Sequence, residues 1–236
     1  MRREVLEQLR RDVEAKRAVV LVTDLDTAEA RLVYPFGDGA GVPPALLAAA
    51  REAAERDQSR KVEGAGAGLF LRVFNPPVRV LIVGAVHIAQ SLARMVQLAG
   101  YDVLVVDPRR SFATGERFGD VPLTAEWPDE VVARVGLDRR SAVVTMTHDP
   151  KIDDPALAAA LRSEAFYVGA LGSKKTQEAR RERLRKAGFS DADLSRIHGP
   201  VGLPIGSVST GEIAVSILSQ LVECLRRPRA SPRAGA

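Results

Sequence analysis

The stretch that decides the fold is VRVLIVGAVHIAQ, residues 78–90. It opens with an apolar run over residues 78–83, in which Arg79 is the one charged residue, and such a run predicts a strand buried on both faces. Gly84 then turns the chain into a helix that we expect at residues 88–98. A buried strand followed by a tight turn and a helix is typical of a βαβ unit, which predicts a parallel sheet.

The same alternation of strands and helices continues downstream. We expect further strands at residues 102–106, 141–145 and 165–168, and helices at residues 129–135, 155–162, 173–187 and 209–225. The last helix begins with Ser209-Thr210-Gly211-Glu212, a capping box. The sequence therefore predicts an α/β fold, a Rossmann-like doubly wound parallel sheet covered by helices on both faces.

Consecutive prolines mark a break upstream of this sheet, at Asn75-Pro76-Pro77. Proline holds the chain extended and has no N–H for a sheet ladder. Residues before the break predict two helices and four short strands, at 3–16, 43–55, 18–25, 30–34, 60–63 and 69–74. We therefore expect a small α/β N-terminal domain over residues 1–75, a Rossmann-like domain over 76–228, and a disordered basic tail over 229–236.

Composition limits the class of protein. Of 236 residues, 46% are apolar and 27% are charged, which is typical of a soluble globular chain. No apolar run approaches the roughly 20 residues of a membrane span, and the mixed charges of the N-terminus do not fit a secretory signal. The single cysteine, Cys224, excludes an internal disulfide. We expect a cytoplasmic protein that does not bind a membrane.

The net charge of +4 does not indicate nucleic-acid binding. The last eleven residues, RRPRASPRAGA, hold four arginines and no acid, so they account for the whole excess. A nucleic-acid groove needs a basic face on the folded body, and single strands also need aromatic side chains on which bases stack. Aromatic residues make up only 5% of this chain, so no nucleic-acid partner is expected.

The candidate binding residues follow the predicted strands. In an open parallel sheet the ligand crevice lies beyond the carboxyl ends of the strands. Four segments follow the apolar runs directly, at residues 84–89, 107–110, 147–150 and 169–175, and we expect them to share one edge of the sheet. They contain the residues that we predict to bind a cofactor, namely Gly84, Ala85, Val86, His87, Asp107, His148, Asp149, Gly172, Ser173, Lys174 and Lys175.

The turn after residues 78–83 is a degenerate dinucleotide fingerprint. The three glycine positions are occupied by Gly84, Val86 and Ala89, and the branched side chain of Val86 stands where a pyrophosphate normally approaches bare backbone. Gly84 either contacts a phosphate or only turns the chain into the helix. Asp107 lies 23 residues further on, a spacing that suits a ribose-binding acid and equally suits an ordinary Asp-Pro turn.

The two later segments carry charged and titratable side chains. Ser173 opens a helix with Lys174 and Lys175 in its first turn, which is a ready anion site, or a plain helix cap with solvated lysines. His148 either contacts a ligand or packs beside a turn at Asp149. No spacing indicates a metal site or a hydrolase triad, so we assign neither metal ligands nor catalytic residues.

Five segments together resemble one family. In order and at family-like spacing, they are similar to the Rossmann half of the XdhC/CoxI family, the maturation factors of molybdenum hydroxylases such as xanthine dehydrogenase and carbon monoxide dehydrogenase. The resemblance covers about residues 69–226. The segments are VRVLIVGAVHIAQ (78–90), THDPKIDDPAL (147–157), YVGALGSKKT (167–176), IHGPVGLPIG (197–206) and GEIAVSIL (211–218).

The resemblance implies a non-catalytic or weakly catalytic accessory protein. Such a chaperone binds the molybdenum cofactor (molybdopterin), a pterin dithiolene that bears a phosphate, and delivers it after sulfuration to the apo-enzyme of a molybdenum hydroxylase. A cysteine desulfurase is a further partner that the resemblance implies. It also implies a homodimer, for which the apolar face of the last helix (Ile213, Ile217, Leu221) is either the shared surface or part of the monomer's core.

The chain departs from the family pattern in two places. The family usually has glycine where Val86 stands, and its N-terminal half usually contains Gly-Ser-x-Pro-Arg and Gly-Gly-Cys-Val-Glu, which residues 1–68 lack. Chemistry that depends on that cysteine is therefore not expected here.

Two alternative functions remain open from the sequence. An NAD(P)-dependent oxidoreductase would suit the spacing of Gly84 and Asp107, although Val86 and the lack of a recognisable proton-donor dyad argue against it. A structural assembly partner of a hydroxylase, with no ligand in the crevice, is the other.

Overall fold

The structure is a computed structural model that describes residues 2–64 and 67–226, and its contacts divide the chain into two units. Of the described residues, the first unit contains those up to Pro77 together with Arg226, and the second spans Val78–Leu225. The basic tail expected at residues 229–236 lies outside the described residues.

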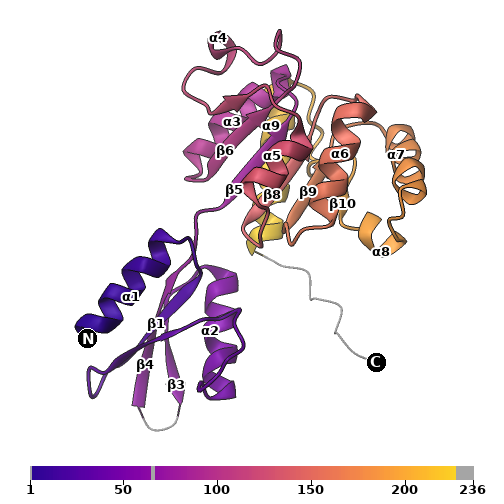
Figure 1. Ribbon diagram of the computed structural model, residues 1–236. Helices are drawn as coiled ribbons and strands as arrows, with labels where there is room; N and C mark the ends of the chain where they lie inside the picture. The colour runs from indigo at the N-terminus through magenta and orange to yellow at the C-terminus, as the bar shows by residue number, and fades with distance from the viewer. Residues whose placement is uncertain (1, 65–66, 227–236) are drawn as a thin grey trace. The chain divides into compact units, whose positions relative to one another are not determined.

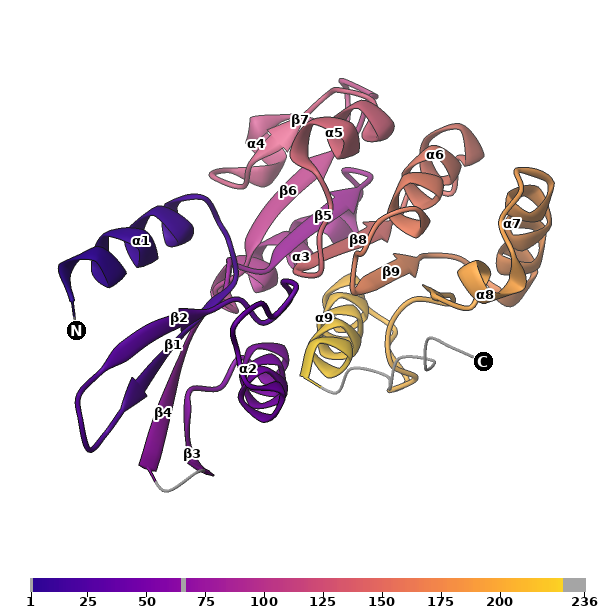
Figure 2. The same cartoon turned by 60° about the horizontal axis from the view of Figure 1, so that its bottom comes forward.

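The first unit is a four-stranded antiparallel sheet with the order β2-β1-β4-β3 and one helix on each face (Figures 1 and 2). Alternate residues of β1 point to opposite faces, so Val20 and Val22 pack with α2 while Val19 and Leu21 pack with α1. The elements are α1 (Arg3–Glu14), β1 (Val19–Asp24), β2 (Ala30–Val33), α2 (Pro44–Arg56), β3 (Arg60–Gly64) and β4 (Ala67–Phe74).

The second unit contains a six-stranded parallel sheet with the order β10-β9-β8-β5-β6-β7. From β7 to β10 this is the Rossmann order 3-2-1-4-5-6, and the direction of winding reverses between β5 and β8. The strands are β5 (Arg79–Val83), β6 (Asp102–Val106), β7 (Leu123–Thr124), β8 (Ser141–Thr145), β9 (Tyr167–Ala170) and β10 (Ile197–His198). The predicted fold class is confirmed.

Helices cover both faces of this sheet (Figure 2). On one face α3 and α9 pack on side chains such as Val80 and Ile82, and on the other α5 and α6 pack on Leu81 and Val83. The helices are α3 (His87–Leu98), α4 (Gly115–Phe118), α5 (Pro128–Val135), α6 (Pro150–Leu161), α7 (Lys174–Lys186), α8 (Asp191–Leu194) and α9 (Thr210–Arg226).

Helix caps explain where the structure agrees with the predicted boundaries and where it differs. The capping box at the start of α9 is present, because Ser209 Oγ accepts from the Glu212 N–H and Glu212 Oε2 accepts from the Ser209 N–H. By contrast, α6 begins at Pro150, five residues before the predicted start. Asp149 caps this earlier start by accepting from the Lys151 N–H at 2.9 Å.

The apolar face of α9 belongs to the core of the second unit. Ile217 and Leu221 have no exposed surface, and Ile213 packs against the same cluster. Of the two roles that the sequence left open for this face, the structure shows the second, a part of the monomer's core, and the homodimer itself stays a prediction.

We predict that truncating Leu92, which is fully buried in α3, lowers the free energy of unfolding by about 2–5 kcal/mol, because Leu92→Ala leaves a cavity. Leu98 lies on the same helix and is 87% exposed, so Leu98→Ala should change it by less than about 0.5 kcal/mol. Urea unfolding of both variants measures the difference. Equal losses would contradict the packing of α3 described above.

Candidate functional site

Four loops meet at the carboxyl edge of the parallel sheet. Strands β6, β5, β8 and β9 are neighbours in that order and run in the same direction, so the loops that follow them lie side by side (Figure 1). These are the segments at residues 107–110, 84–89, 147–150 and 171–175. The fourth was expected to begin at residue 169, but Gly169 and Ala170 are the last residues of β9. The prediction that they share one edge is confirmed, and each neighbouring pair of loops is joined by a specific contact.

Asp107 joins the loops after β6 and β5. Its side chain is fully buried, and its Oδ2 accepts from the Ala85 N–H at 2.8 Å. Arg109 donates to both carboxylate oxygens, from Nε at 2.9 Å and from Nη2 at 2.7 Å, and its own N–H donates to Oδ1 at 3.0 Å. Burial raises the pKa of Asp107, but the hydrogen bonds from Arg109 and Ala85 outweigh burial and hold the pKa below its usual value.

Gly84 joins the loops after β5 and β8 by close approach. Its φ of +113° lies in a region that favours glycine, and a β-carbon here would lie 2.8 Å from Thr147 Cγ2. After this turn, Val86 packs against the core beneath α3 and α9, and His87 is exposed at the first position of α3. Val86, which the sequence places where a pyrophosphate normally approaches the backbone, is thus half-buried against this core.

Asp153 holds the loop after β8 in shape. Its carboxylate accepts from Thr147 N at 3.2 Å, from Thr147 Oγ1 at 2.7 Å and from His148 N at 3.1 Å. His148 has a φ of +62°, a left-handed conformation that is uncommon for a residue other than glycine, and its side chain is exposed. The hydrogen bond from its N–H fixes the direction in which the imidazole leaves the backbone. Asp149 caps α6, as described above.

Arg180 of α7 joins the loops after β8 and β9. Its Nη2 lies 3.3 Å from Asp153 Oδ2 and donates to the Leu171 carbonyl at 3.2 Å. The two charged side chains are 1% and 2% exposed. Burial raises the pKa of Asp153 and lowers that of Arg180, because both charges have left water. A buried pair of this kind contributes little net stability, but it fixes the positions of the groups that it joins.

Gln177 extends this buried network to β9 and to the loop after β10. Its Oε1 accepts from Arg180 Nη1 at 2.6 Å, and its Nε2 donates to the Ala170 carbonyl at 2.8 Å. A β-carbon on Gly199 would collide with the Gln177 amide, so the loop after β10 packs directly on this side chain. Asp153, Arg180 and Gln177 thus hold the loops after β8, β9 and β10 in place through buried contacts.

The loop after β9 ends in a capped helix. Gly172 has a φ of +137°, and Ser173 Oγ accepts from the Thr176 N–H at 3.2 Å. The Gln177 N–H donates to the Ser173 carbonyl at 3.0 Å. Lys174 and Lys175 are exposed in the first turn of α7. Their backbone N–H groups donate to no acceptor in residues 2–64 and 67–226, so they are available to a ligand.

The sequence reasoning missed Asp153, Arg180 and Gln177. A signal for two of them is present, because Gln177, Arg180 and Leu184 are spaced as one buried stripe of α7. A charged residue on such a stripe requires a buried partner. That partner is Asp153, which lies in α6 but two residues before the start that the sequence predicted for this helix. The predicted helix therefore did not include it.

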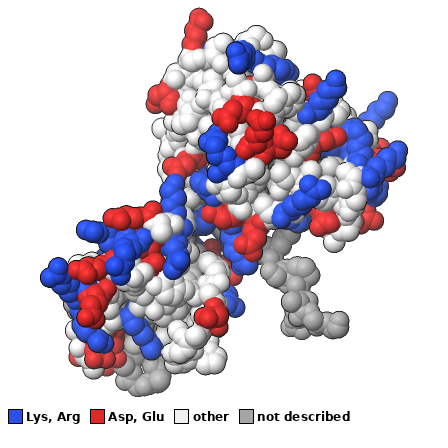
Figure 3. Space-filling view, in the orientation of Figure 1, with Lys and Arg blue, Asp and Glu red and all other residues white. Residues whose placement is uncertain are grey.

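The described residues show no feature of a metal site or of a membrane span. On the face in Figure 3, Lys and Arg side chains are mixed with Asp and Glu. Within residues 2–64 and 67–226, no group of three His, Cys, Asp or Glu residues could hold a metal ion. In the same ranges, every helix is too short or too polar to cross a bilayer.

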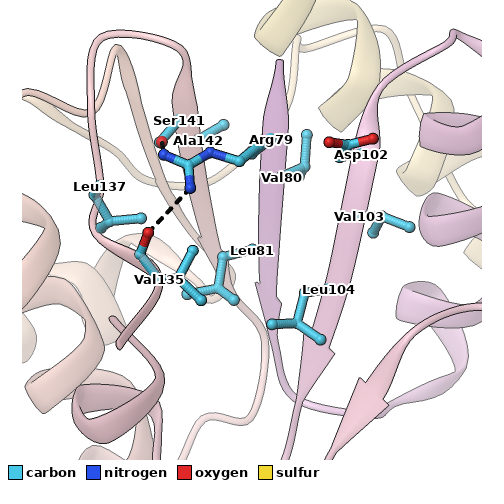
Figure 4. Close-up of a pocket in the computed structure, with 10 residues that line it drawn as sticks. All are labelled: Arg79, Val80, Leu81, Asp102, Val103, Leu104, Val135, Leu137, Ser141 and Ala142. Atoms are coloured by element: carbon cyan, nitrogen blue, oxygen red, sulfur yellow. Dashed lines mark hydrogen bonds between the residues drawn. The ribbon is translucent and has the colours of Figure 1, made fainter. Parts of the chain in front are cut away.

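A small pocket lies at the opposite edge of the parallel sheet, beside the amino ends of β5, β6 and β8 (Figure 4). Its lining is mainly apolar, and Arg79 extends along it. The Arg79 guanidinium donates to the Val135 carbonyl at 3.1 Å and to the Gly136 carbonyl at 2.8 Å, and it pairs with Asp138 at 2.9 Å. Arg79 therefore ties β5 to the end of α5, and we treat this contact as structural.

We predict that Arg180→Met lowers the free energy of unfolding by about 3–5 kcal/mol, because it leaves the Asp153 carboxylate buried without a counterion. Arg181→Met is the matched control, since the Arg181 side chain makes no hydrogen bond or ion pair with any described residue. Urea unfolding should show a change below about 0.5 kcal/mol for the control. Comparable losses in both variants would contradict the buried network.

We predict that Asp107→Asn lowers the free energy of unfolding at pH 7 by about 2–3 kcal/mol, the value of hydrogen bonds to a charged group. The pKa of Asp107 is lowered in the folded chain, so its carboxylate stabilises the fold above the unfolded-state pKa of about 3.9. This contribution is lost as the pH falls through the folded-state pKa. Unfolding at a series of pH values should show a constant deficit down to about pH 5 that shrinks below about pH 4. A deficit of the same size throughout would mean that Asp107 is not ionised.

The chain matches the XdhC Rossmann domain over residues 80–221. It is 28% identical over 148 residues to the molybdenum cofactor insertion chaperone PaoD of Escherichia coli, covering 63% of this chain and 40% of that protein. It is 26% identical over 161 residues to a probable xanthine dehydrogenase subunit of Bacillus subtilis, covering 67% and 46%. The chain thus spans less than half the length of these two relatives.

A solved structure has the same fold. The crystal structure of a xanthine dehydrogenase from Bacillus halodurans superposes with a TM-score of 0.69 at 23% identity, over 98% of this chain and 67% of that one. The domain match spans more than half of the 236 residues and includes all four loops of the carboxyl edge. The chain belongs to the XdhC family.

Proposed function

We propose that this chain binds the molybdenum cofactor and helps to insert it into a molybdenum hydroxylase. Two findings support a maturation role, namely the XdhC domain itself and the similarity to PaoD, a molybdenum cofactor insertion chaperone. The observation that carries the proposal is structural. In the XdhC domain of this chain, α3 and α7 both begin at the carboxyl edge of the sheet, with only the end of β8 between them.

The phosphate of the cargo would bind at the start of α7. The Lys174 and Lys175 N–H groups are available there, the helix dipole favours an anion, and two ammonium groups add charge-assisted hydrogen bonds. Ser173 Oγ accepts the Thr176 N–H and lies 3.0 Å from Thr176 Oγ1, so the hydroxyl orders the turn that would hold the phosphate. This arrangement fits a phosphate that is bound without being hydrolysed.

The rest of the cargo would extend toward α3. Strands β9 and β5 are separated by one strand, so their ends lie about 10 Å apart, twice the spacing of neighbouring strands. That distance suits a ligand longer than a single phosphate. Exposed His148 and His87 offer hydrogen bonds to the polar edges of a pterin, and Asp153 fixes the backbone that presents His148.

The experiment that tests the proposal begins with the chain purified together with its native ligand, which is then identified by mass. Release of molybdopterin supports the proposal, and release of NAD(P) or of no ligand contradicts it. Thermal unfolding gives an independent measure, because a ligand present at 100 times its Kd adds about 2.7 kcal/mol to the free energy of unfolding.

We predict that Lys174→Glu combined with Lys175→Glu abolishes retention of molybdopterin, because the anion then meets two carboxylates. The unfolding of the ligand-free chain should be nearly unchanged, since acidic side chains are favourable at a helix N-terminus. Arg185→Glu with Lys186→Glu makes the same change in net charge at the other end of α7 and should retain the ligand. Retention at the wild-type level by the first variant would remove the start of α7 from the proposed site.

A further inference from the structure

We propose that Arg109 determines which ligand the crevice accepts at the end of β6: it closes Asp107 to a ribose diol and offers its guanidinium to a phosphoryl group. The inference goes beyond the proposed function, in which the phosphate of molybdopterin lies at the start of α7, because it concerns a separate position at the end of β6. A ligand group at this position would be a phosphomonoester without a neighbouring diol.

Asp107 has no capacity left for a ribose. In a dinucleotide-binding Rossmann domain, an acid at this position accepts hydrogen bonds from ribose hydroxyls. A carboxylate has about four lone-pair sites, and those of Asp107 already accept four hydrogen bonds, one from Ala85 and three from Arg109. The carboxylate is also fully buried. A diol could bind only by displacing Arg109.

Arg109 is held so that displacement is unfavourable. Its guanidinium makes a two-point contact with the Asp107 carboxylate, the geometry in which an arginine–carboxylate pair is strongest. The same guanidinium lies over the ring of Phe112, 4.3 Å from its centroid. Phe112 belongs to the loop that follows β6, so the loop itself supports the arginine. Loss of the pair would leave a buried carboxylate without a counterion.

Part of the Arg109 guanidinium remains available to a ligand. Its side chain is 32% exposed, and Nη1 donates to no residue in the described part of the chain. Hydrogen bonds to Asp107 raise the pKa of Arg109, and two further carboxylates raise it through their charge. These are Asp149, which caps α6, and Asp153, which also pairs with Arg180. Planar N–H donors of arginine match the oxygens of a phosphoryl group, and an arginine beside the ribose site is the usual means of accepting a phosphate there.

The test compares two small probes that differ only at this corner. Adenosine 2′,5′-bisphosphate carries a phosphoryl group where adenosine 5′-monophosphate has a free diol. We expect the wild-type chain to bind the bisphosphate at least about tenfold more tightly, the contribution of one charge-assisted hydrogen bond. Arg109→Gln should abolish this ratio. Arg110→Gln removes the exposed neighbouring arginine and should leave the ratio unchanged. Calorimetric titration measures both dissociation constants.

Three results would overturn the inference: equal affinities in the wild-type chain, no binding of either probe, or an unchanged ratio in Arg109→Gln. An unchanged ratio in Arg109→Gln together with a lowered melting temperature would mean that the ion pair between Arg109 and Asp107 is purely structural. Arg109→Lys is the second variant if Arg109→Gln does not fold, because lysine keeps a positive charge beside Asp107 but lacks the paired N–H donors of a guanidinium. This variant should reduce the ratio of the two affinities.

The two proposals can fail separately. A chain that retains molybdopterin but does not distinguish the probes contradicts only the role of Arg109. A chain that distinguishes the probes but never retains molybdopterin contradicts only the proposed function.

Discussion

The buried ion pair between Asp153 and Arg180 is the contact on which the carboxyl edge of the parallel sheet depends. Loops that follow parallel strands have no strand pairing of their own, so side chains must give them a fixed shape. Here one carboxylate holds the turn at Thr147 and His148, and the arginine that pairs with it holds the carbonyl of Leu171. Two loops that are separate in sequence are thereby fixed relative to each other.

Each neighbouring pair of loops at this edge is joined by a different kind of contact. Between β6 and β5 it is a carboxylate that accepts a backbone N–H, and between β5 and β8 it is a glycine that permits close contact. Between β8 and β9 it is the buried charge pair. The polar groups beneath the loops are mostly bonded to the chain itself, whereas exposed groups such as Lys174, Lys175 and His148 face outward. This separation of supporting groups from exposed ones is what a binding site requires.

Periodicity and position predicted the fold well, but they predicted the support of the site poorly. Strands 102–106 and 141–145 have the bounds that their apolar runs indicate, whereas β7 and β10 are two residues long, too short to leave a pattern. The Rossmann rule located the four loops, because it depends only on strand direction. The hydrogen bonds of Asp107 and Asp153 depend on tertiary contacts with residues that the sequence did not associate with them. The assignment of the eleven candidate residues to ligand binding stays a prediction.

Arg79 has a consequence for how this domain can vary. Arg79 donates to the Val135 carbonyl, the last of α5, and to the Gly136 carbonyl that follows it, and so fixes the amino end of β5 independently of the loops at the other edge. Insertions or exchanges in those loops therefore need not disturb the contacts of Arg79 at the amino ends of the strands. A scaffold of this kind suits engineering by cassette replacement, in which whole loops are swapped for new cargo while the base is left intact.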